Sequence, residues 1–475
     1  MKSIHEYLDD CLEKWSGDPY IYTKTDSGFV SRTFKEIISD ARALAAAIYN
    51  GDANRRIYIY AENSAEWLIC DLAAMGYSGI CVPLDKEWTA FDLENVLSRD
   101  EKGVFFYAES KSETVDKIRN NFRGLSFYSI EKDLPSLIQN GGTLTLPPQN
   151  DLDKTVKIIF TSGTTARPKA ISLSQRNMLS NSKALFERTP MDHSDKDYLF
   201  LPLSHVYAGV TNFLYTLISG MRIYLCRDLR EINQDVISIK PTVVCTVPIM
   251  LSAMHRLMTD ELLDALRQVR YFYIGGSTSD PDLKDWFLQR GVTILEAYGT
   301  TETSVIAVSK IVNGKAESTA SLLEGPAVKI INADENGIGE IIVSGASVSA
   351  GYLDFPDNSR YFDENGYFHT GDLGRLDGEG HLYLAGRKKR VLDTSDGNNV
   401  YADEIENMLK ESPLINSAKV YIEDGEITAS VFADLKAHTR GEIKNYVSTV
   451  NDKLPKFKRI RTLHITDDKL GGRLK

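Results

Sequence analysis

The sequence has no long hydrophobic run, which argues against a membrane-spanning helix. No stretch of its 475 residues approaches the ~18 consecutive apolar residues that cross a bilayer. The first residues, MKSIHEYLDDCLEKW, are amphipathic and acidic, whereas a secretory signal peptide has a basic start and then an apolar run. We therefore expect neither a membrane span nor a signal peptide, and a cytoplasmic location.

The sequence also contains few cysteines and more acidic than basic residues. The five cysteines are odd in number, scattered, and mostly set among apolar residues, which is typical of buried thiols in a reducing compartment. They are Cys11, Cys70, Cys81, Cys226 and Cys245. A disulfide framework or a zinc site is not expected. The net charge of −11 argues against a nucleic-acid partner, because such proteins neutralise phosphates with basic surfaces.

The sequence does contain an alternation of short apolar strands and amphipathic helices. Hydrophobic residues make up 42% and charged residues 25%, as in soluble globular proteins, and 475 residues are too many for one core. Periodicity predicts helices at 34–48, 65–75, 91–97 and 174–186, and strands at 56–61, 78–82, 104–107, 156–160, 197–203, 222–226, 243–247, 270–274 and 292–295. Glycine, proline and asparagine predict a loop over 135–148. The order predicts an α/β fold with a mostly parallel sheet.

Residues 158–171, IIFTSGTTARPKAI, are the most informative stretch. The apolar strand runs into a cluster of hydroxyls and one glycine, namely Thr161, Ser162, Gly163, Thr164 and Thr165. These residues predict an irregular loop, whose N–H groups and hydroxyls, with Lys169 at the end, suit a polyphosphate. It is not a Walker A loop, since proline precedes the lysine and alanine follows it. A plain Ser/Thr-rich surface loop is the alternative.

Three later segments carry further candidates. EAYGTTET, at 296–303, offers an aromatic ring that can stack on a purine and a carboxylate that can hold Mg²⁺ beside phosphates. Gly275-Gly276-Ser277 follows a strand, and glycines let a backbone approach a flat base closely. YFHTGDLG, at 367–374, places Asp372 in a glycine-rich turn, where a carboxylate can accept two ribose hydroxyls. The ordinary alternative is a set of structural turns.

In this order, the segments resemble those of the adenylate-forming enzymes, the superfamily of acyl- and aryl-CoA synthetases, carrier-protein adenylation domains and luciferases. NSAEWLICDLAAMGYSGICVPLD, at 63–85, shares the resemblance but is expected only to build the fold. GRKKRVLDTSDGNNVYADEIE, at 386–406, is most like long-chain fatty acyl-CoA synthetases. The resemblance implies a large N-terminal AMP-binding domain of layered α/β subdomains, 1–386, and a small mobile α+β domain, 387–475, with a hinge near 387–391.

The resemblance also implies roles for single residues. Tyr298 would stack on adenine, Thr301 would contact the α-phosphate, and Glu302 would bind Mg²⁺. The residues expected to contact ATP or CoA are Thr161, Ser162, Gly163, Thr164, Thr165, Lys169, Gly276, Ser277, Tyr298, Gly299, Thr300, Thr301, Asp372, Arg387 and Gly397. Those expected to take part in catalysis are Thr161, Lys169, His205, Thr301, Glu302 and Arg473. His205 would line the acyl channel and move between half-reactions; a structural histidine is the alternative.

The sequence departs from the family most at its C-terminus, DDKLGGRLK. The family ends with a Gly-Lys pair, and that lysine bridges the substrate carboxylate and the α-phosphate. In one register Arg473 replaces it and Lys475 follows; in the other Gly472 occupies its place and the charge is lost, leaving Lys469 as a nearby cation. We prefer the first register. Ala166 and Ala170 also replace usual glycines of the phosphate loop, and Arg390 replaces an acid at the hinge.

The leading hypothesis is an ATP-dependent ligase that activates a fatty or aryl acid as acyl-AMP. The thiol acceptor is either CoA or the phosphopantetheine of an acyl carrier protein. A carrier protein would dock on a basic cluster of Lys453, Lys456, Lys458, Arg459 and Arg461. The candidates for lining the acid pocket are largely apolar, which weakly favours a fatty or aryl acid over an amino acid. They are His205, Val206, Val210, Pro248, Gly275 and Gly276. The rival hypothesis is a non-catalytic nucleotide- or acyl-binding member that lost the bridging lysine.

Overall fold

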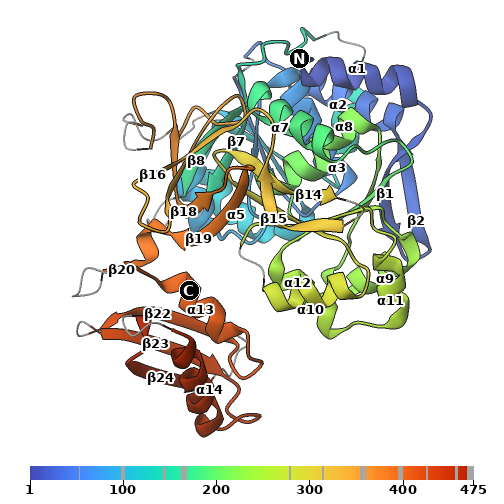
Figure 1. Cartoon of the computed structure of the whole chain (residues 1–475). Coiled ribbons are helices and arrows are strands. Elements are labelled where there is room, and N and C mark those ends of the chain that lie inside the picture. The colour runs from blue at the N-terminus through green and yellow to red at the C-terminus, as the bar shows by residue number, and fades with distance from the viewer. Residues whose placement is uncertain are drawn as a thin grey trace. The chain divides into compact units, whose positions relative to one another are not determined.

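The computed structural model (Figure 1) describes the chain except residues 53, 98–101, 143–145, 162–167, 278–279, 313–314, 354–357, 359–360, 394–398, 424–425, 455–457 and 468–475. The chain divides into two compact units. The first unit comprises Met1–Ser279, Trp286–Ala327 and Ser344–Gly366, and the second comprises Asp280–Asp285, Val328–Val343 and Tyr367–Lys475. The expected hinge near 387–391 lies inside the second unit, and the expected domain division at 386 stays a prediction.

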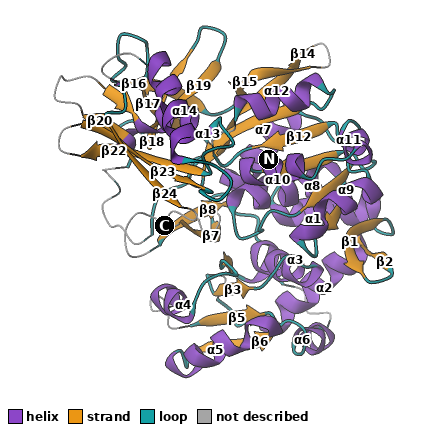
Figure 2. Cartoon of the chain, turned by 90° about the horizontal axis from the view of Figure 1, so that it is seen from below, coloured by secondary structure: helices purple, strands orange, loops and turns teal. Residues whose placement is uncertain are grey.

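The first unit contains a six-stranded sheet of order β6-β5-β3-β4-β7-β8. Its strands are β3 (Arg56–Tyr60), β4 (Ile80–Pro83), β5 (Gly103–Tyr107), β6 (Leu125–Ser129), β7 (Thr155–Thr161) and β8 (Lys169–Ser174). All pairs are parallel except β7–β8. Figure 2 shows helices on both faces of β3, β5 and β6. One face carries α4 (Ala90–Leu97) and α5 (Ser112–Ile118). The other face carries α2 (Phe34–Ile48), α3 (Ala65–Ala73) and α6 (Leu134–Gly141). The predicted α/β layering is confirmed.

Two predictions for this region are wrong. The expected loop at 135–148 begins with helix α6, because Pro135 lies in its first turn, where the missing N–H has no intrahelical partner to lose. The expected irregular segment after residue 160 returns to a strand at Lys169, the first residue of β8. In both places a proline lies at the start of a helix or just before a strand, and it does not mark a segment without regular structure.

A second sheet of the first unit runs in the order β15-β14-β13-β12-β11-β9-β10-β1-β2. The strands are β1 (Pro19–Thr25), β2 (Gly28–Thr33), β9 (Lys196–Leu199), β10 (Arg222–Leu225), β11 (Val243–Thr246), β12 (Tyr271–Ile274), β13 (Ile294–Thr300), β14 (Ser304–Val312) and β15 (Lys315–Leu322). Strands β9 to β13 and β1 run parallel. The carboxyl ends of β11, β12 and β13 therefore lie at one edge, where open α/β sheets bind ligands.

The described part of the second unit contains three sets of paired strands and the helices α13 and α14. Strands β16 (Ala327–Ile331), β17 (Gly339–Ser344), β18 (Phe368–Leu376) and β19 (His381–Arg387) are neighbours in that order, and β20 (Val391–Asp393) pairs with β21 (Asn399–Tyr401). A three-stranded sheet of β22 (Ser417–Glu423), β23 (Glu426–Ala433) and β24 (Thr462–Asp467) packs with α13 (Ala402–Lys410) and α14 (Arg440–Lys453). Their shared core includes Ile405, Leu409, Val431, Ile443 and Val447.

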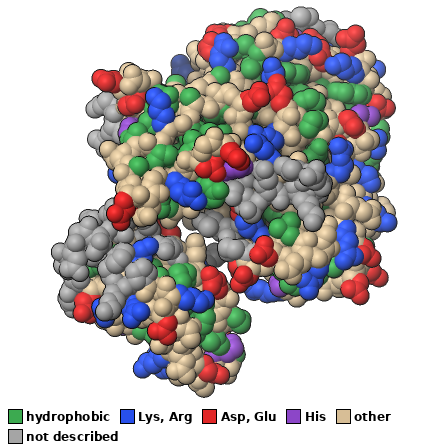
Figure 3. Space-filling view, viewed as in Figure 1, with side chains coloured by type: hydrophobic (Ala, Val, Ile, Leu, Met, Phe, Trp, Pro, Cys, Tyr) green, Lys and Arg blue, Asp and Glu red, His purple; other side chains and the backbone are tan. Residues whose placement is uncertain are grey.

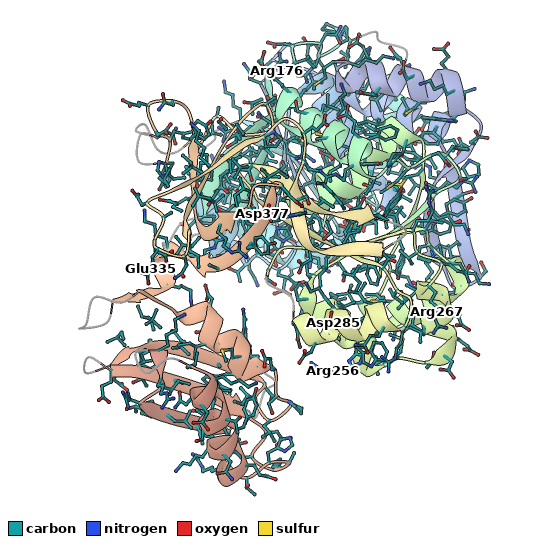
Figure 4. The ribbon with its side chains drawn as sticks, in the orientation of Figure 1. Arg176, Arg256, Arg267, Asp285, Glu335 and Asp377 are labelled. Atoms are coloured by element: carbon teal, nitrogen blue, oxygen red, sulfur yellow. The ribbon has the colours of Figure 1, made fainter. Side chains whose placement is uncertain are left out.

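The surface carries both signs of charge. On the face drawn in Figure 3, acidic and basic side chains are interspersed and no broad basic face is visible. Arg256 and Arg267 project at the periphery (Figure 4), and Arg267 pairs with Asp264 at 2.6 Å, a surface contact typically worth under about 1 kcal/mol. None of the helices in the described ranges is long and apolar enough to cross a bilayer. All five cysteines are free, and four are buried, as predicted.

Candidate active site

Strands β7 and β8 form the stem of the expected phosphate loop. Thr161, the last residue of β7, lies directly opposite Lys169, the first residue of β8. Ala170, where the family has glycine, is buried and pairs with Phe160. The loop residues Ser162, Gly163, Thr164 and Thr165 lie outside the described part of the chain. The hairpin therefore brings the two ends of the loop together as a pair.

The ammonium of Lys169 lies beside two tyrosines. Its Nζ donates a hydrogen bond to the Tyr361 hydroxyl at 3.0 Å. The same atom lies 4.8 Å from the ring centroid of Tyr352 and 4.6 Å from that of Tyr361. The two rings meet edge to face, with centroids 4.5 Å apart. The hydrogen bond to the Tyr361 hydroxyl and the attraction of the Tyr352 ring hold the cation at the start of β8.

Glu302 reaches the same tyrosine from another segment. The Tyr352 hydroxyl donates to Glu302 Oε1 at 2.5 Å, and the Ser349 N–H donates to the Glu302 carbonyl at 2.7 Å. One tyrosine thus holds the carboxylate through its hydroxyl and the Lys169 ammonium against its ring. The structure brings these two sequence-predicted residues together.

The strand that leads to Tyr298 is longer than predicted, because it does not end at Leu295. Residues 296–300 belong to strand β13 itself, which is irregular between Tyr298 and Gly299. A Cβ on Gly299 would lie 1.9 Å from the Ser304 carbonyl oxygen, so only glycine fits. Thr300 N–H donates to the Thr303 hydroxyl at 3.1 Å, which tightens the turn carrying Thr301. Tyr298 is half-buried on this strand.

Gly276 and Ser277 follow β12, the strand beside β13. The register pairs Ile274 with Glu296, so the segment after β12 lies next to that of Tyr298. Gly276 has φ +83°, a left-handed conformation that favours glycine, and both Gly276 and Ser277 are exposed. Their contact with a base therefore stays a prediction.

His205 is exposed in a loop that Asn63 braces. The Asn63 side chain donates to the Leu201 carbonyl at 2.8 Å and accepts from the Leu203 N–H at 3.0 Å. The His205 carbonyl accepts from the Gly209 N–H at 3.1 Å, which leads the chain into a π-helical turn at Ala208–Leu214. The scaffold role expected for the segment at 63–85 is therefore visible at its first residue.

The two expected ribose contacts pair with each other in the second unit. Asp372 was expected in a glycine-rich turn, but it lies in strand β18, opposite Arg387 of β19. Arg387 Nε lies 2.5 Å from Asp372 Oδ1, and the Asp372 side chain is 9% exposed. Gly371, with φ +69°, supplies the irregular backbone that suggested a turn. Gly397 and Arg473 lie outside the described residues.

Basic residues after Gly386 form ion pairs with acidic side chains and are not simply exposed to solvent. Lys388 Nζ lies 2.7 Å from Glu340 Oε2, and His369 Nδ1 lies 3.4 Å from the same oxygen. Burial raises the pKa of Glu340, but hydrogen bonds from Lys388 and His369 outweigh it and lower the pKa below its usual value. Arg390 pairs with Asp403 at 2.7 Å and with Glu406. Its positive charge, unusual for the family, is thus matched by acids of α13.

Sequence reasoning missed Tyr352 and Tyr361, and nothing local marks them. Tyr361 is 192 residues from Lys169 in the chain, and Tyr352 is 50 residues from Glu302. It also missed the buried ion pair between Lys157 and Asp71, 2.9 Å apart with side chains 2% and 0% exposed. No periodicity relates residues so far apart.

Comparisons with known proteins agree with this geometry. The profile of the family described as AMP-binding enzyme matches residues 9–353. A 2-succinylbenzoate–CoA ligase of Oceanobacillus iheyensis is 26% identical over 87% of this chain and 85% of its own length. A long-chain-fatty-acid–CoA ligase of Mycobacterium bovis is 27% identical over 86% and 78%. The crystal structure of ATP-bound MatB from Rhodopseudomonas palustris shares the fold, with TM-score 0.85, 24% identity and coverage of 98% and 95%. The chain therefore belongs to the AMP-binding enzyme family, as an AMP-forming acid–thiol ligase.

Proposed function

We propose that the chain is an ATP-dependent acid–CoA ligase whose acid is a fatty or aryl acid. The observation that carries this proposal is the joint attachment of Lys169 and Glu302 to Tyr352. Because both groups contact one tyrosine, the Lys169 ammonium and the Glu302 carboxylate would act on the same polyphosphate. The apolar residues among those proposed to line the acid site, such as Val206 and Pro248, favour an apolar acid over an amino acid.

The phosphates of ATP are assigned to the β7–β8 loop. Thr161 and Lys169, opposite each other at its stem, would hold the β- and γ-phosphates together with Ser162, Gly163, Thr164 and Thr165. Thr301, in the turn after β13, would donate to the α-phosphate. Donors fixed in this way would stabilise the negative charge that develops on the leaving pyrophosphate.

Glu302 is the proposed metal-binding residue. Proteins hold Mg²⁺ with one or two carboxylates and leave the remaining positions to substrate phosphates and water, so one oriented carboxylate fits this ion. The Tyr352 hydroxyl orients the carboxylate through Oε1. When bound, the ion would neutralise phosphate charge.

Residues of each unit are proposed to contact the nucleoside, and they are named here unit by unit. Tyr298 would stack on adenine, with Gly276, Ser277, Gly299 and Thr300 at its edge. Asp372 would accept the ribose hydroxyls, and Arg387, which pairs with it here, would share the same ribose.

The reaction would proceed in two displacements. The acid carboxylate attacks the α-phosphorus, the bond to the bridging oxygen breaks, and pyrophosphate leaves. The small domain then rotates at the hinge near 387–391, and Gly397 leaves room for the pantetheine arm. The thiol sulfur attacks the acyl carbon, AMP leaves, and the thiol proton passes to solvent. His205 would line the acid site; acting as a general base is not required of it, because a carboxylic acid is ionised at neutral pH.

The direct test is carboxylate-dependent exchange of pyrophosphate into ATP with a panel of fatty, aryl and amino acids. We expect exchange with at least one fatty or aryl acid. Absence of exchange with every acid of the panel would contradict the proposal. Product formation with CoA against acyl carrier protein then identifies the acceptor; a carrier would dock on the cluster of Lys453, Lys456, Lys458, Arg459 and Arg461, of which Lys456 lies outside the described residues.

A second candidate follows from the C-terminus. If Arg473 cannot replace the family's lysine, the chain binds ATP without releasing pyrophosphate. Arg473→Lys would then create exchange where the natural chain has none. If Arg473 does the work, the natural chain is active, Arg473→Ala loses on the order of 100-fold in kcat, and Lys475→Ala does not.

A further inference from the structure

One carboxylate of helix α13 contacts the chain where it leaves strand β19. Asp403, the second residue of α13, accepts a hydrogen bond through Oδ2 from the Arg387 N–H at 3.1 Å. Its Oδ1 lies 2.7 Å from Arg390 Nε, which is close enough for an ion pair although not oriented for a hydrogen bond. Both partners belong to the second unit, as Asp403 does. One side chain therefore contacts both ends of the segment 387–390, which we call the linker.

The residue before the linker leaves room for this carboxylate. Gly386 has φ +139°, a conformation that side chains rarely adopt. A Cβ added at Gly386 would lie 3.2 Å from Asp403 Oδ2 and 3.4 Å from Asp403 Cβ, and the first of these distances is shorter than most contacts of a Cβ. A side chain at Gly386 would therefore press the carboxylate away from the Arg387 N–H.

The first two side chains of the linker pair with the strands that precede it. Arg387 Nε lies 2.5 Å from Asp372 Oδ1 of β18, and Lys388 Nζ lies 2.7 Å from Glu340 Oε2 of β17. Both acids are less than 10% exposed, whereas both basic side chains are more than half exposed. The start of the linker is thus attached to the β17–β18 strands.

Arg390 pairs instead with the helix that follows the linker, through Asp403 and Glu406. Glu406 also accepts from the Val420 N–H at 2.6 Å, so these charges are tied to α13 and β22. Between Lys388 and Arg390, the side-chain partners of the linker therefore change from the strands before it to the helix after it.

We propose that Asp403 is a positioning residue that latches the linker to α13 and so stabilises one orientation of the hinge. This inference rests on the proposed function, in which the small domain rotates near 387–391 between the two displacements. Such a rotation moves α13 relative to β19, so the bond from the Arg387 N–H has to break, whereas the pair with Arg390 can move with the helix. Because the site is partly exposed, with Asp403 at 26% and Arg390 at 36%, we expect an effect of about fivefold on the hinge equilibrium.

Trypsin tests the latch without any substrate, because the linker reads RKKR. Cleavage is counted after Lys388, whose side chain pairs with Glu340, so that merely freeing Arg390 is not what is measured. Asp403→Ala should raise this cleavage rate about fivefold, since proteolysis follows the population of the open form. Asp403→Asn keeps an oxygen that can accept from the Arg387 N–H and should give a smaller rise; it serves if the alanine variant does not fold.

Glu423→Gln is the matched control for cleavage. It removes a carboxylate of strand β22 that pairs with His464 at 3.0 Å, and it should be cleaved at the rate of the natural chain. Folded Asp403 variants that are also cleaved at the natural rate would overturn the latch.

The second readout is the balance between the two half-reactions. Pyrophosphate exchange reports formation of acyl-AMP, and CoA-dependent thioester release reports the second displacement. Because the latch favours one orientation of the hinge, Asp403→Ala should change the ratio of these two rates about fivefold, and Glu423→Gln should not. Faster cleavage with an unchanged ratio would show that Asp403 has only a structural role and would overturn the inference. Absence of exchange with every acid contradicts the proposed function itself, and cleavage then still decides whether the latch exists.

Discussion

Replacing Tyr352 by phenylalanine separates the two halves of the proposed nucleotide site. The variant keeps the ring that faces Lys169 at 4.8 Å but removes the 2.5 Å hydrogen bond to Glu302. A hydrogen bond to a charged group is worth about 1.5–3 kcal/mol, or about 10- to 150-fold in an equilibrium constant. The proposed role of the bond is to orient the carboxylate, so its loss should weaken the affinity for Mg²⁺ first.

The assay is pyrophosphate exchange measured against free Mg²⁺ concentration. For Tyr352→Phe we expect the Mg²⁺ midpoint to rise about 10- to 100-fold, the usual effect of removing a group that orients a metal ligand. At saturating Mg²⁺ the KM for ATP should change little, because the Lys169–ring contact remains. The variant should also keep the thermal stability of the natural chain to within a few degrees.

Tyr361→Phe is the matched control. It removes the 3.0 Å bond to Lys169 Nζ and does not touch Glu302. We expect the KM for ATP to rise about fivefold, the effect of a bond worth about 1 kcal/mol, with an unchanged Mg²⁺ midpoint. If both variants shift the Mg²⁺ midpoint equally, or neither does, the assignment of the lysine to phosphate and the carboxylate to metal is refuted.

Two further predictions concern buried charge in the first unit. Lys157→Met should destabilise the chain by about 3–5 kcal/mol because it strands the Asp71 carboxylate, while the double variant with Asp71→Leu should recover most of the loss in urea unfolding; equal damage in both would contradict this account. Burial raises the pKa of Asp197 from 3.8 to about 7 despite the hydrogen bond from Asn212. The folded state then holds a proton that the unfolded state releases, so stability falls as pH rises from about 4 to about 7, by roughly 4 kcal/mol at most. Asp197→Asn should flatten the dependence of Tm on pH in this range, and an unchanged slope would show that Asp197 is not its source.

The errors of the sequence-based reading share one cause. Proline and glycine often mark loops, so Pro135 predicts a loop and the glycines around Asp372 predict a turn. Pro135 instead lies in the first turn of α6, and Gly371 and Gly374 belong to strand β18. Proline and glycine restrict or free the backbone of one residue, but the neighbouring strand or helix decides whether the chain continues in a regular element.

The sequence by itself determined the α/β alternation, the hydroxyl-rich loop closed by Lys169 and the segment of Glu302, because strand length, helical periodicity and motif chemistry are local properties. Only the tertiary structure decided that Tyr352 joins Lys169 to Glu302, that Lys157 lies against Asp71, and that Asp403 joins Arg387 to Arg390. Such contacts join residues tens to hundreds of positions apart. They depend on the register and packing of strands, which no local pattern encodes.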